Sequence, residues 1–92
     1  MENDLLEVML ACVEGRLDEI ELKFCDKACV TVVLASKGYP VKYEKGFPIS
    51  GLESLKGETD VYCYHAGTRF DEAGRIVTNG GRVLDVTALG QT

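Results

Sequence analysis

The first apolar positions of the chain follow the spacing of a helix. Asp4 is followed three residues later by Glu7, just before an apolar run, which is the arrangement of a helix-capping box. Gly15 stands where a left-handed cap would end the helix. The pattern predicts a helix over residues 4–14 whose apolar positions pack in a core. Burial of this wide apolar face requires a partner surface larger than the rest of the helix can provide. The apolar positions are Leu5, Leu6, Val8, Met9, Cys12 and Val13.

The spacing changes after residue 27 to that of strands. Residues 28–36 are apolar and rich in β-branched side chains, which predicts a buried strand. Lys37-Gly38-Tyr39-Pro40 then predicts a turn, because Pro40 cannot donate to a sheet and Gly38 frees the backbone. A loop punctuated by glycine and proline follows, with one short strand expected around 47–49.

The remaining residues predict an antiparallel meander. A strand is expected over 61–65, then a hairpin that turns at 71–74 between strands 68–70 and 75–78. Asn79-Gly80-Gly81 predicts a second hairpin turn, with positive φ angles, before a strand over 82–88. The fold class is therefore α+β: one N-terminal helix followed by a small, mostly antiparallel curled sheet or half-barrel of five to six strands.

Composition narrows the possible functions. The 92 residues fit one small domain with ordinary globular content, 46% hydrophobic and 27% charged. The net charge of −5 argues against a nucleic-acid surface, although a local basic pocket is compatible with the cations in the strand-rich part. No apolar run is long enough to span a membrane and no signal peptide is evident, which favours a cytoplasmic protein with reduced thiols.

The four cysteines do not predict a metal site. Cys25 and Cys29 form one close pair without a second ligand pair, and the single histidine, His65, follows Cys63 by two residues on an expected strand. We therefore expect no metal, and we expect Cys12 and Cys29 to be small core residues.

No residue is predicted to be catalytic. His65 has the side chain that titrates nearest neutrality, but no nucleophile motif accompanies it, so we expect it to cap backbone groups or to line a domain seam. The carboxylate pairs at 18–19 and 71–72 are adjacent in sequence and indicate solvated turns. The sequence has neither a dinucleotide-binding nor a triphosphate-binding glycine motif. Arg82, beside Gly80-Gly81, has the planar donor fork suited to phosphate or carboxylate, and a hairpin turn and an anion contact are compatible roles for this segment.

Several blocks, in this order and spacing, resemble the phosphoribosylamine-glycine ligases. The blocks are Val32 to Pro40, Tyr43 to Gly46, Ile49 to Leu52, His65 to Thr68, Val77 to Leu84 and Val86 to Gly90. The resemblance extends from near Asp4 to Thr92. Two positions depart from it, since Val41 and Asp85 stand where that family usually has glycine. If either glycine had positive φ, the replacement would introduce backbone strain.

The resemblance implies an ATP-grasp enzyme that joins glycine to 5-phosphoribosylamine through an acyl phosphate in purine biosynthesis, with ATP and magnesium as cofactors of the parent enzyme. Residues 1–27 would be the terminal helix and connector of the ATP-grasp portion, and residues 28–92 a truncated C-terminal β domain. The family's acidic metal-binding segment and its ATP-binding lysines are not in this sequence. The chain alone is therefore expected to be inactive and to bind no cofactor.

The resemblance also assigns expected roles. Arg82 is most like an arginine that helps to hold the ribose 5-phosphate in related enzymes, with Gly81 beside it and Lys37 as a weaker second candidate. His65 and Thr68 would shape the seam between domains. The expected partners are the remaining domains of the ligase and its small-molecule substrate, with no nucleic acid and no membrane. The alternative is a non-catalytic β domain that acts as an interaction or self-association module, since an apolar helix and an uncovered strand would expose hydrophobic surface.

Overall fold

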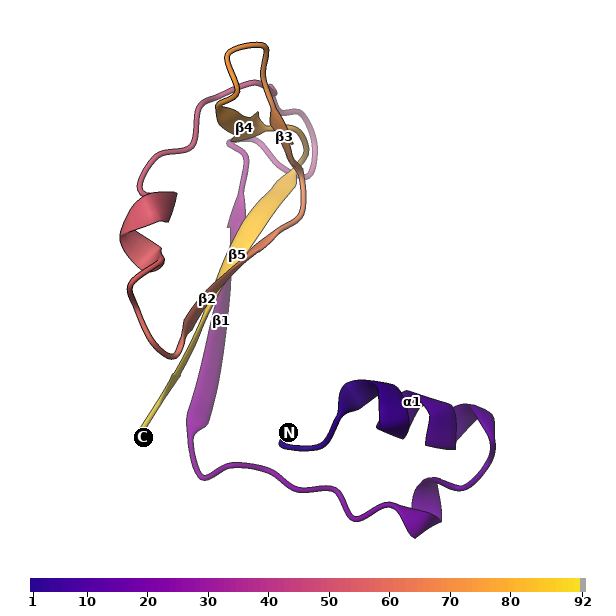
Figure 1. Cartoon of the computed structure of the whole chain (residues 1–92). Helices are drawn as coiled ribbons and strands as arrows, with labels where there is room; N and C mark the ends of the chain where they lie inside the picture. Colours follow the sequence, from indigo (N-terminus) through magenta and orange to yellow (C-terminus); the bar gives the residue numbers. More distant parts are fainter. Residues whose placement is uncertain (92) are drawn as a thin grey trace.

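The computed structural model describes residues 1–91, and in them one helix precedes five antiparallel strands that do not close into a barrel (Figure 1). This confirms the predicted α+β class, although the strands form two sheets. The helix is α1 (Leu5–Val13), and the strands are β1 (Ala28–Ala35), β2 (Val61–His65), β3 (Thr68–Phe70), β4 (Ile76–Thr78) and β5 (Arg82–Gly90). Two short 3-10 helices, η1 (Leu17–Glu19) and η2 (Leu52–Leu55), lie in the connections.

The ends of α1 are formed by the residues that the sequence indicates. The side chain of Asp4 accepts a hydrogen bond from the backbone N–H of Leu6 at 2.9 Å, as an N-cap does. Gly15 has a φ of 69°, the left-handed conformation that follows a helix end. The predicted helix is therefore confirmed to within a residue at each end.

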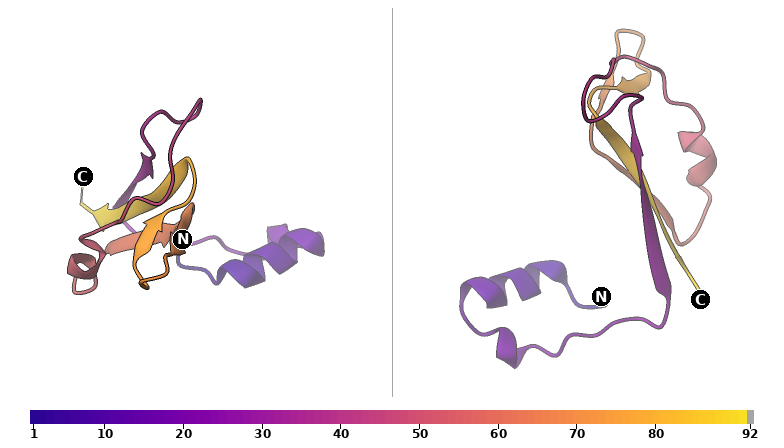
Figure 2. Two further views of the ribbon diagram at one scale, coloured as in Figure 1. Left: turned by 90° about the horizontal axis from the view of Figure 1, so that it is seen from above. Right: turned by 180° about the vertical axis from the view of Figure 1, so that it is seen from behind.

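The helix and its connector form a unit that stands apart from the sheets (Figures 1 and 2). Asn3 ties the connector back to the start of the chain: its Nδ2 donates to the carbonyl of Glu21 at 2.9 Å, and its Oδ1 accepts from the N–H of Lys23 at 2.7 Å. The radius of gyration is 17.5 Å, whereas a compact domain of this length has about 12 Å. The molecule is therefore open.

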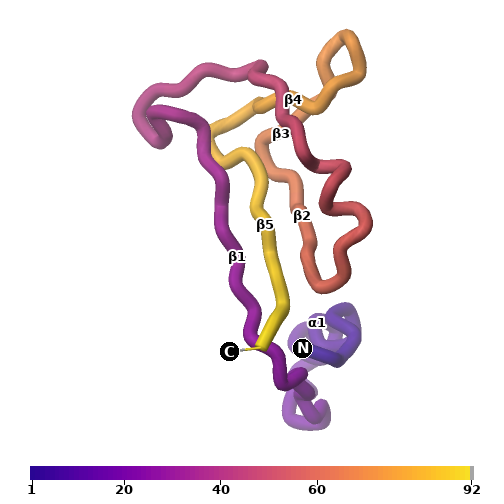
Figure 3. The backbone as a smooth tube through the Cα atoms, turned by 90° about the vertical axis from the view of Figure 1, so that its left-hand side faces the viewer, coloured from indigo at the N-terminus to yellow at the C-terminus, as the bar shows by residue number. Residues whose placement is uncertain are grey.

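The larger sheet has the order β1-β5-β2, with β5 in the centre (Figure 3). Val32 on β1 and Cys63 on β2 both lie opposite Val86 on β5, so one face of the sheet carries apolar side chains from all three strands. We call it the apolar face; it carries Val30, Val32, Leu34, Val61, Cys63, Leu84, Val86 and Ala88, with His65 at its end opposite Leu84. The other face, which we call the mixed face, carries Thr31, Val33, Tyr62, Tyr64, Asp85 and Thr87.

The smaller sheet confirms the first predicted hairpin. β3 pairs with β4, and Asp71 fixes the turn between them by accepting hydrogen bonds from the N–H groups of Ala73 and Arg75 at 2.9 and 2.8 Å. The strand expected around 47–49 is reduced to one bridge, between Pro48 and Val77. Backbone hydrogen bonds flank this bridge on both sides, from the Thr78 N–H to the Phe47 carbonyl and from the Ile49 N–H to the Ile76 carbonyl, both at 2.9 Å.

The second predicted hairpin is wrong. β4 pairs with β3, whereas β5 pairs with β1 and β2, so residues 79–81 carry the chain from one sheet to the other. Neither Gly80 nor Gly81 has a positive φ. These glycines are therefore not needed for turn geometry, and the contacts described below explain them.

The expected burial is also wrong in three places. The predicted buried strand β1 is largely exposed, with Val30 and Val32 at 63% and 58% exposure. The apolar residues of α1 are mostly exposed, and so are Cys12 and Cys29. The buried apolar residues are Ala11, Val77, Val83 and Leu84. The physical reason is that little within residues 1–91 packs over α1 or over most of β1, which agrees with the expected exposure of hydrophobic surface.

Candidate functional site

The turn that follows β1 separates two cavities. The N–H of Tyr39 donates to the backbone carbonyl of Ser36 at 3.1 Å, and the N–H groups of Val41 and Lys42 donate to the carbonyl of Gly38 at 3.0 and 3.2 Å. The Tyr39-Pro40 peptide bond is cis. Gly38 has a φ of 91°, and a Cβ there would overlap the carbonyl of Lys42. The predicted turn is confirmed, and it requires glycine.

One cavity, of about 600 Å³, contains two of the three predicted site residues, Gly81 and Arg82. We call it the Arg82 pocket. Its other notable lining residues are Gly67, the aromatic pair Tyr39 and Tyr43, and Asp85. Lys37, the third predicted residue, does not line it.

Close backbone contact at the edge of this pocket explains two of the sequence motifs. The N–H of Gly67 donates to the carbonyl of Arg82 at 2.9 Å, and the N–H of Asn79 donates to the carbonyl of Gly67 at 2.7 Å. A Cβ on Gly67 would lie 2.7 Å from the Arg82 carbonyl oxygen and 2.9 Å from the Cα of Gly80. The segments 65–68 and 79–82 therefore lie backbone against backbone, which only glycine allows.

Gly81 is held from its other side by β1 and by the turn. The N–H of Ser36 donates to the carbonyl of Gly81, and the Ser36 hydroxyl donates to the carbonyl of Gly80, both at 2.7 Å. A Cβ on Gly81 would overlap the ring of Tyr39. The ring centroids of Tyr39 and Tyr43 are 6.0 Å apart and tilted by 50°, so these aromatic side chains pack over the glycine backbone.

The guanidinium of Arg82 is available for a ligand. The side chain is exposed, and within residues 1–91 it forms neither a hydrogen bond nor an ion pair. Arginine presents five donors in a planar fork that matches phosphate or carboxylate. The pocket therefore offers a free anion-binding group beside a glycine backbone that the Tyr39 ring covers.

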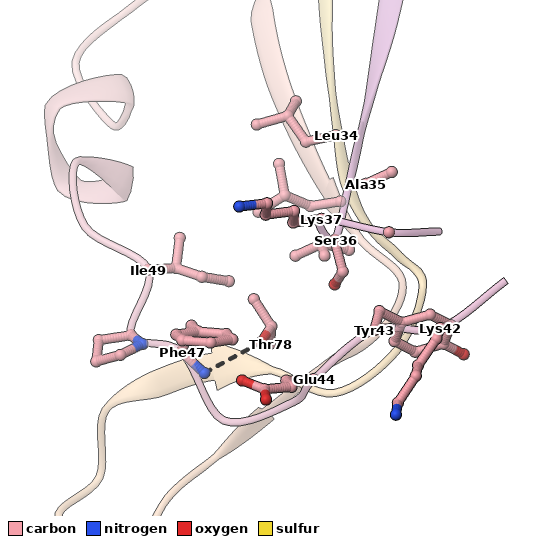
Figure 4. Close-up of a pocket in the computed structure, with 14 residues that line it drawn as sticks. Leu34, Ala35, Ser36, Lys37, Lys42, Tyr43, Glu44, Phe47, Ile49 and Thr78 are labelled. Atoms are coloured by element: carbon pink, nitrogen blue, oxygen red, sulfur yellow. Dashed lines mark hydrogen bonds between the residues drawn. The ribbon is translucent and has the colours of Figure 1, made fainter. Parts of the chain in front are cut away.

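The second cavity is a mainly apolar groove of about 880 Å³, and Lys37 lines it (Figure 4). The groove lies between the end of the larger sheet, represented by Leu34 and Leu84, and the loop that carries Phe47 and Ile49. The N–H of Phe47 donates to the Thr78 hydroxyl at 3.1 Å, which ties this loop to β4. The structure thus separates Lys37 from Gly81 and Arg82.

The other candidates have structural contacts. The Nδ1 of His65 lies 3.0 Å from the Thr68 hydroxyl, at the junction of β2 and β3. In the described part of the chain no group of three or more His, Cys, Asp or Glu side chains could hold a metal ion, and no helix is long and apolar enough to cross a membrane. Neither Val41 nor Asp85 has a positive φ, so the two departures from the family pattern introduce no backbone strain of that kind.

Fold and pocket define a small, open antiparallel β domain with an anion-compatible pocket. Residues 29–92 match the family model described as phosphoribosylglycinamide synthetase, C domain, and the chain belongs to this family.

Similar proteins agree with this family. The chain is 49% identical over its whole length to the bifunctional purine biosynthetic protein purD of Dictyostelium discoideum and 48% identical to the phosphoribosylamine–glycine ligase of Caldanaerobacter subterraneus. It is 45% identical, over 98% of its length, to the phosphoribosylamine–glycine ligase of Vigna unguiculata. The chain spans 11%, 21% and 29% of these three relatives, respectively.

Proposed function

We propose that this chain acts as the C-terminal part of a phosphoribosylamine–glycine ligase, which joins glycine to 5-phosphoribosylamine in purine biosynthesis. The main support for this proposal is the match of residues 29–92 to the C-domain family. The chain is also 45–49% identical to relatives that are named as phosphoribosylamine–glycine ligases or as a purine biosynthetic protein. The described residues contain no cluster suited to a metal ion. In this proposal ATP, which would supply the phosphoryl group of the acyl phosphate, and magnesium are bound by the rest of the enzyme.

Within that enzyme, the Arg82 pocket forms one wall of the substrate site. Arg82 contacts the substrate phosphate, and Gly81, buried under the Tyr39 ring, helps to position Arg82 at the pocket. The free guanidinium and the glycine packed under Tyr39 support these roles. Lys37 is a secondary phosphate contact at most, because it lines the apolar groove.

The remaining domains of the ligase are the partners that this proposal assigns. Residues 1–27 are the terminal helix and connector of the ATP-grasp portion, and residues 28–92 form the β domain. The separation of α1 from the sheets supports this division (Figure 2). The exposed apolar residues of α1 and β1 are suited to packing against other domains. A cytoplasmic location is part of the same proposal, supported by four free cysteines.

A chimeric ligase tests the function. The 92 matching residues of the Caldanaerobacter enzyme are replaced by this chain, and ATP-dependent formation of glycinamide ribonucleotide is measured. The chimera should turn over, whereas the 92-residue chain alone should not. In the chimera, Arg82→Gln should raise the KM for phosphoribosylamine about tenfold or more, since charged hydrogen bonds contribute about 1.5–3 kcal/mol.

Arg69→Gln is the matched control, because Arg69 is also exposed but lies outside the Arg82 pocket. Equal effects of the two substitutions would refute the assigned role of Arg82. Turnover by the isolated chain would refute the proposal that other domains carry the chemistry.

The exposed apolar surface favours a second candidate function, a self-association module. Leu6 and Val13 on α1 are 64% and 85% exposed, and Val30 on β1 is 63% exposed. Sedimentation at micromolar concentration should then show a dimer or larger species, which Leu6→Asp weakens and the control Glu7→Gln does not. A monomer at all concentrations would exclude this function.

A further inference from the structure

We propose that Asp85 selects the sugar end of the ligand in the Arg82 pocket, by accepting hydrogen bonds from hydroxyl or amine groups of a phosphorylated pentose. This inference rests on the proposed phosphate contact of Arg82. It adds a second polar group, at a position where the sequence resemblance leads one to expect glycine.

A β-bulge brings Asp85 and Arg82 to one face of the sheet. Residues three apart on a regular strand point to opposite faces. Here Leu34 pairs with Leu84 but Ala35 pairs with Arg82, so Val83 is an extra residue in β5. The extra residue moves Arg82 to the face that carries Asp85, and both side chains line the same pocket. Bulges commonly re-aim a side chain in this way at functional sites.

The carboxylate of Asp85 is held in place through one oxygen. The Thr87 hydroxyl donates to Oδ1 at 2.8 Å, and the Thr31 hydroxyl lies 2.7 Å from that of Thr87 and 3.1 Å from Oδ1. Each threonine has one hydroxyl proton, so Thr31 can donate to Thr87 while Thr87 donates to Asp85. Within residues 1–91, Oδ2 has no hydrogen-bond partner, and it remains an acceptor for a ligand.

The arrangement fits a ligand with an anion at one end and donors at the other. Arg82 and Asp85 are three residues apart on β5, which separates their Cα atoms by about 10 Å. The long Arg82 side chain can bring its guanidinium closer to the Asp85 carboxylate, so a phosphorylated pentose fits between the two groups. Tyr39 and Tyr43 supply an apolar wall beside it. A carboxylate repels a bare phosphate but accepts from hydroxyl or ammonium groups. Asp85 should therefore favour a sugar phosphate over inorganic phosphate.

Amide NMR titrations of the 92-residue chain test this inference. Ribose 5-phosphate and inorganic phosphate are titrated separately, and the dissociation constants are taken from the shifts of the Gly81 and Arg82 amides. The native chain should bind ribose 5-phosphate more tightly than phosphate. Asp85→Asn should reduce this preference about tenfold, as expected for loss of a charge-assisted hydrogen bond, and should leave the phosphate affinity equal or higher.

Asp26→Asn is the matched control, because it removes one negative charge from an exposed residue outside the pocket. Asp85→Ser is a second variant, with amide dispersion as the check that each protein is folded. A preference that survives both Asp85 substitutions, while phosphate still shifts Gly81 and Arg82, would overturn the role of Asp85 alone. If neither ligand shifts these amides, the phosphate site itself is wrong, and the role of Asp85 is wrong with it.

Discussion

Replacement of Gly67 by alanine should strongly destabilise the β domain. A Cβ there would lie 2.7 Å from the Arg82 carbonyl oxygen, and ordinary contact begins at 3.4 Å, so the two backbones must separate by about 0.7 Å. Overpacking of this kind costs about 1–3 kcal/mol. The shift also lengthens the hydrogen bonds from Gly67 to Arg82 and from Asn79 to Gly67, and each such bond contributes about 1 kcal/mol.

The expected loss in the free energy of unfolding is therefore about 2–4 kcal/mol, against a total of about 5–14 kcal/mol for a domain of this length. Urea unfolding measures it, followed by circular dichroism and by tyrosine fluorescence, since the chain has four tyrosines and no tryptophan. Gly57→Ala is the matched control, because a Cβ at Gly57 meets nothing within 4 Å. Equal unfolding free energies for the two variants would refute the backbone-contact argument.

Three further substitutions test local interactions. Asp4→Ala removes the N-cap of α1 and should cost about 1 kcal/mol, seen as lower helical ellipticity. Backbone hydrogen bonding from Arg75 lowers the pKa of Asp71. The Asp71 carboxylate therefore stabilises the folded chain above its unfolded pKa, and this stabilisation is lost as pH falls through the folded pKa. The NMR shift of the Arg75 amide should follow this acid titration in the native chain and should not follow it in Asp71→Asn. The hydrogen bond to Asp60 raises the pKa of Lys27, so that pair stabilises below the unfolded pKa and is lost as pH rises through the folded pKa. Lys27→Gln should flatten the alkaline limb of the thermal stability profile, by an amount that salt reduces because the pair is exposed.

Local signals predicted the elements whose geometry depends on neighbouring residues. Asp4 and Gly15 mark the ends of α1, and the turn at 71–74 marks the β3–β4 hairpin. The pairing of β5 with β1 and β2 was not predictable from such signals, because it joins residues far apart in the chain: Val86 lies 54 positions after Val32 and 23 after Cys63. The assumption that successive strands pair produced the mistaken hairpin at Gly80-Gly81.

In the candidate site, too, sequence reasoning placed neighbouring residues together but did not find the contacts between distant ones. Gly81 and Arg82 are adjacent in sequence and line one pocket, but Lys37 lies in the groove on the other side of the turn. Tyr39 was visible in sequence only as part of a turn, and nothing there placed it over Gly81. Asp85 was visible as a departure from the family pattern, but the bulge that aligns it with Arg82 depends on the register with β1.

The central position of β5 has a consequence for the order of folding. β1 and β2 precede β5 in the chain and do not pair with each other, so neither has a partner strand until residues 82–90 are available. The larger sheet therefore cannot begin to form while the chain is synthesised up to that point, and it must close loops of high sequence separation when it does. During that interval the apolar residues of β1 are unpaired as well as uncovered, which makes this stretch prone to aggregation in the nascent protein.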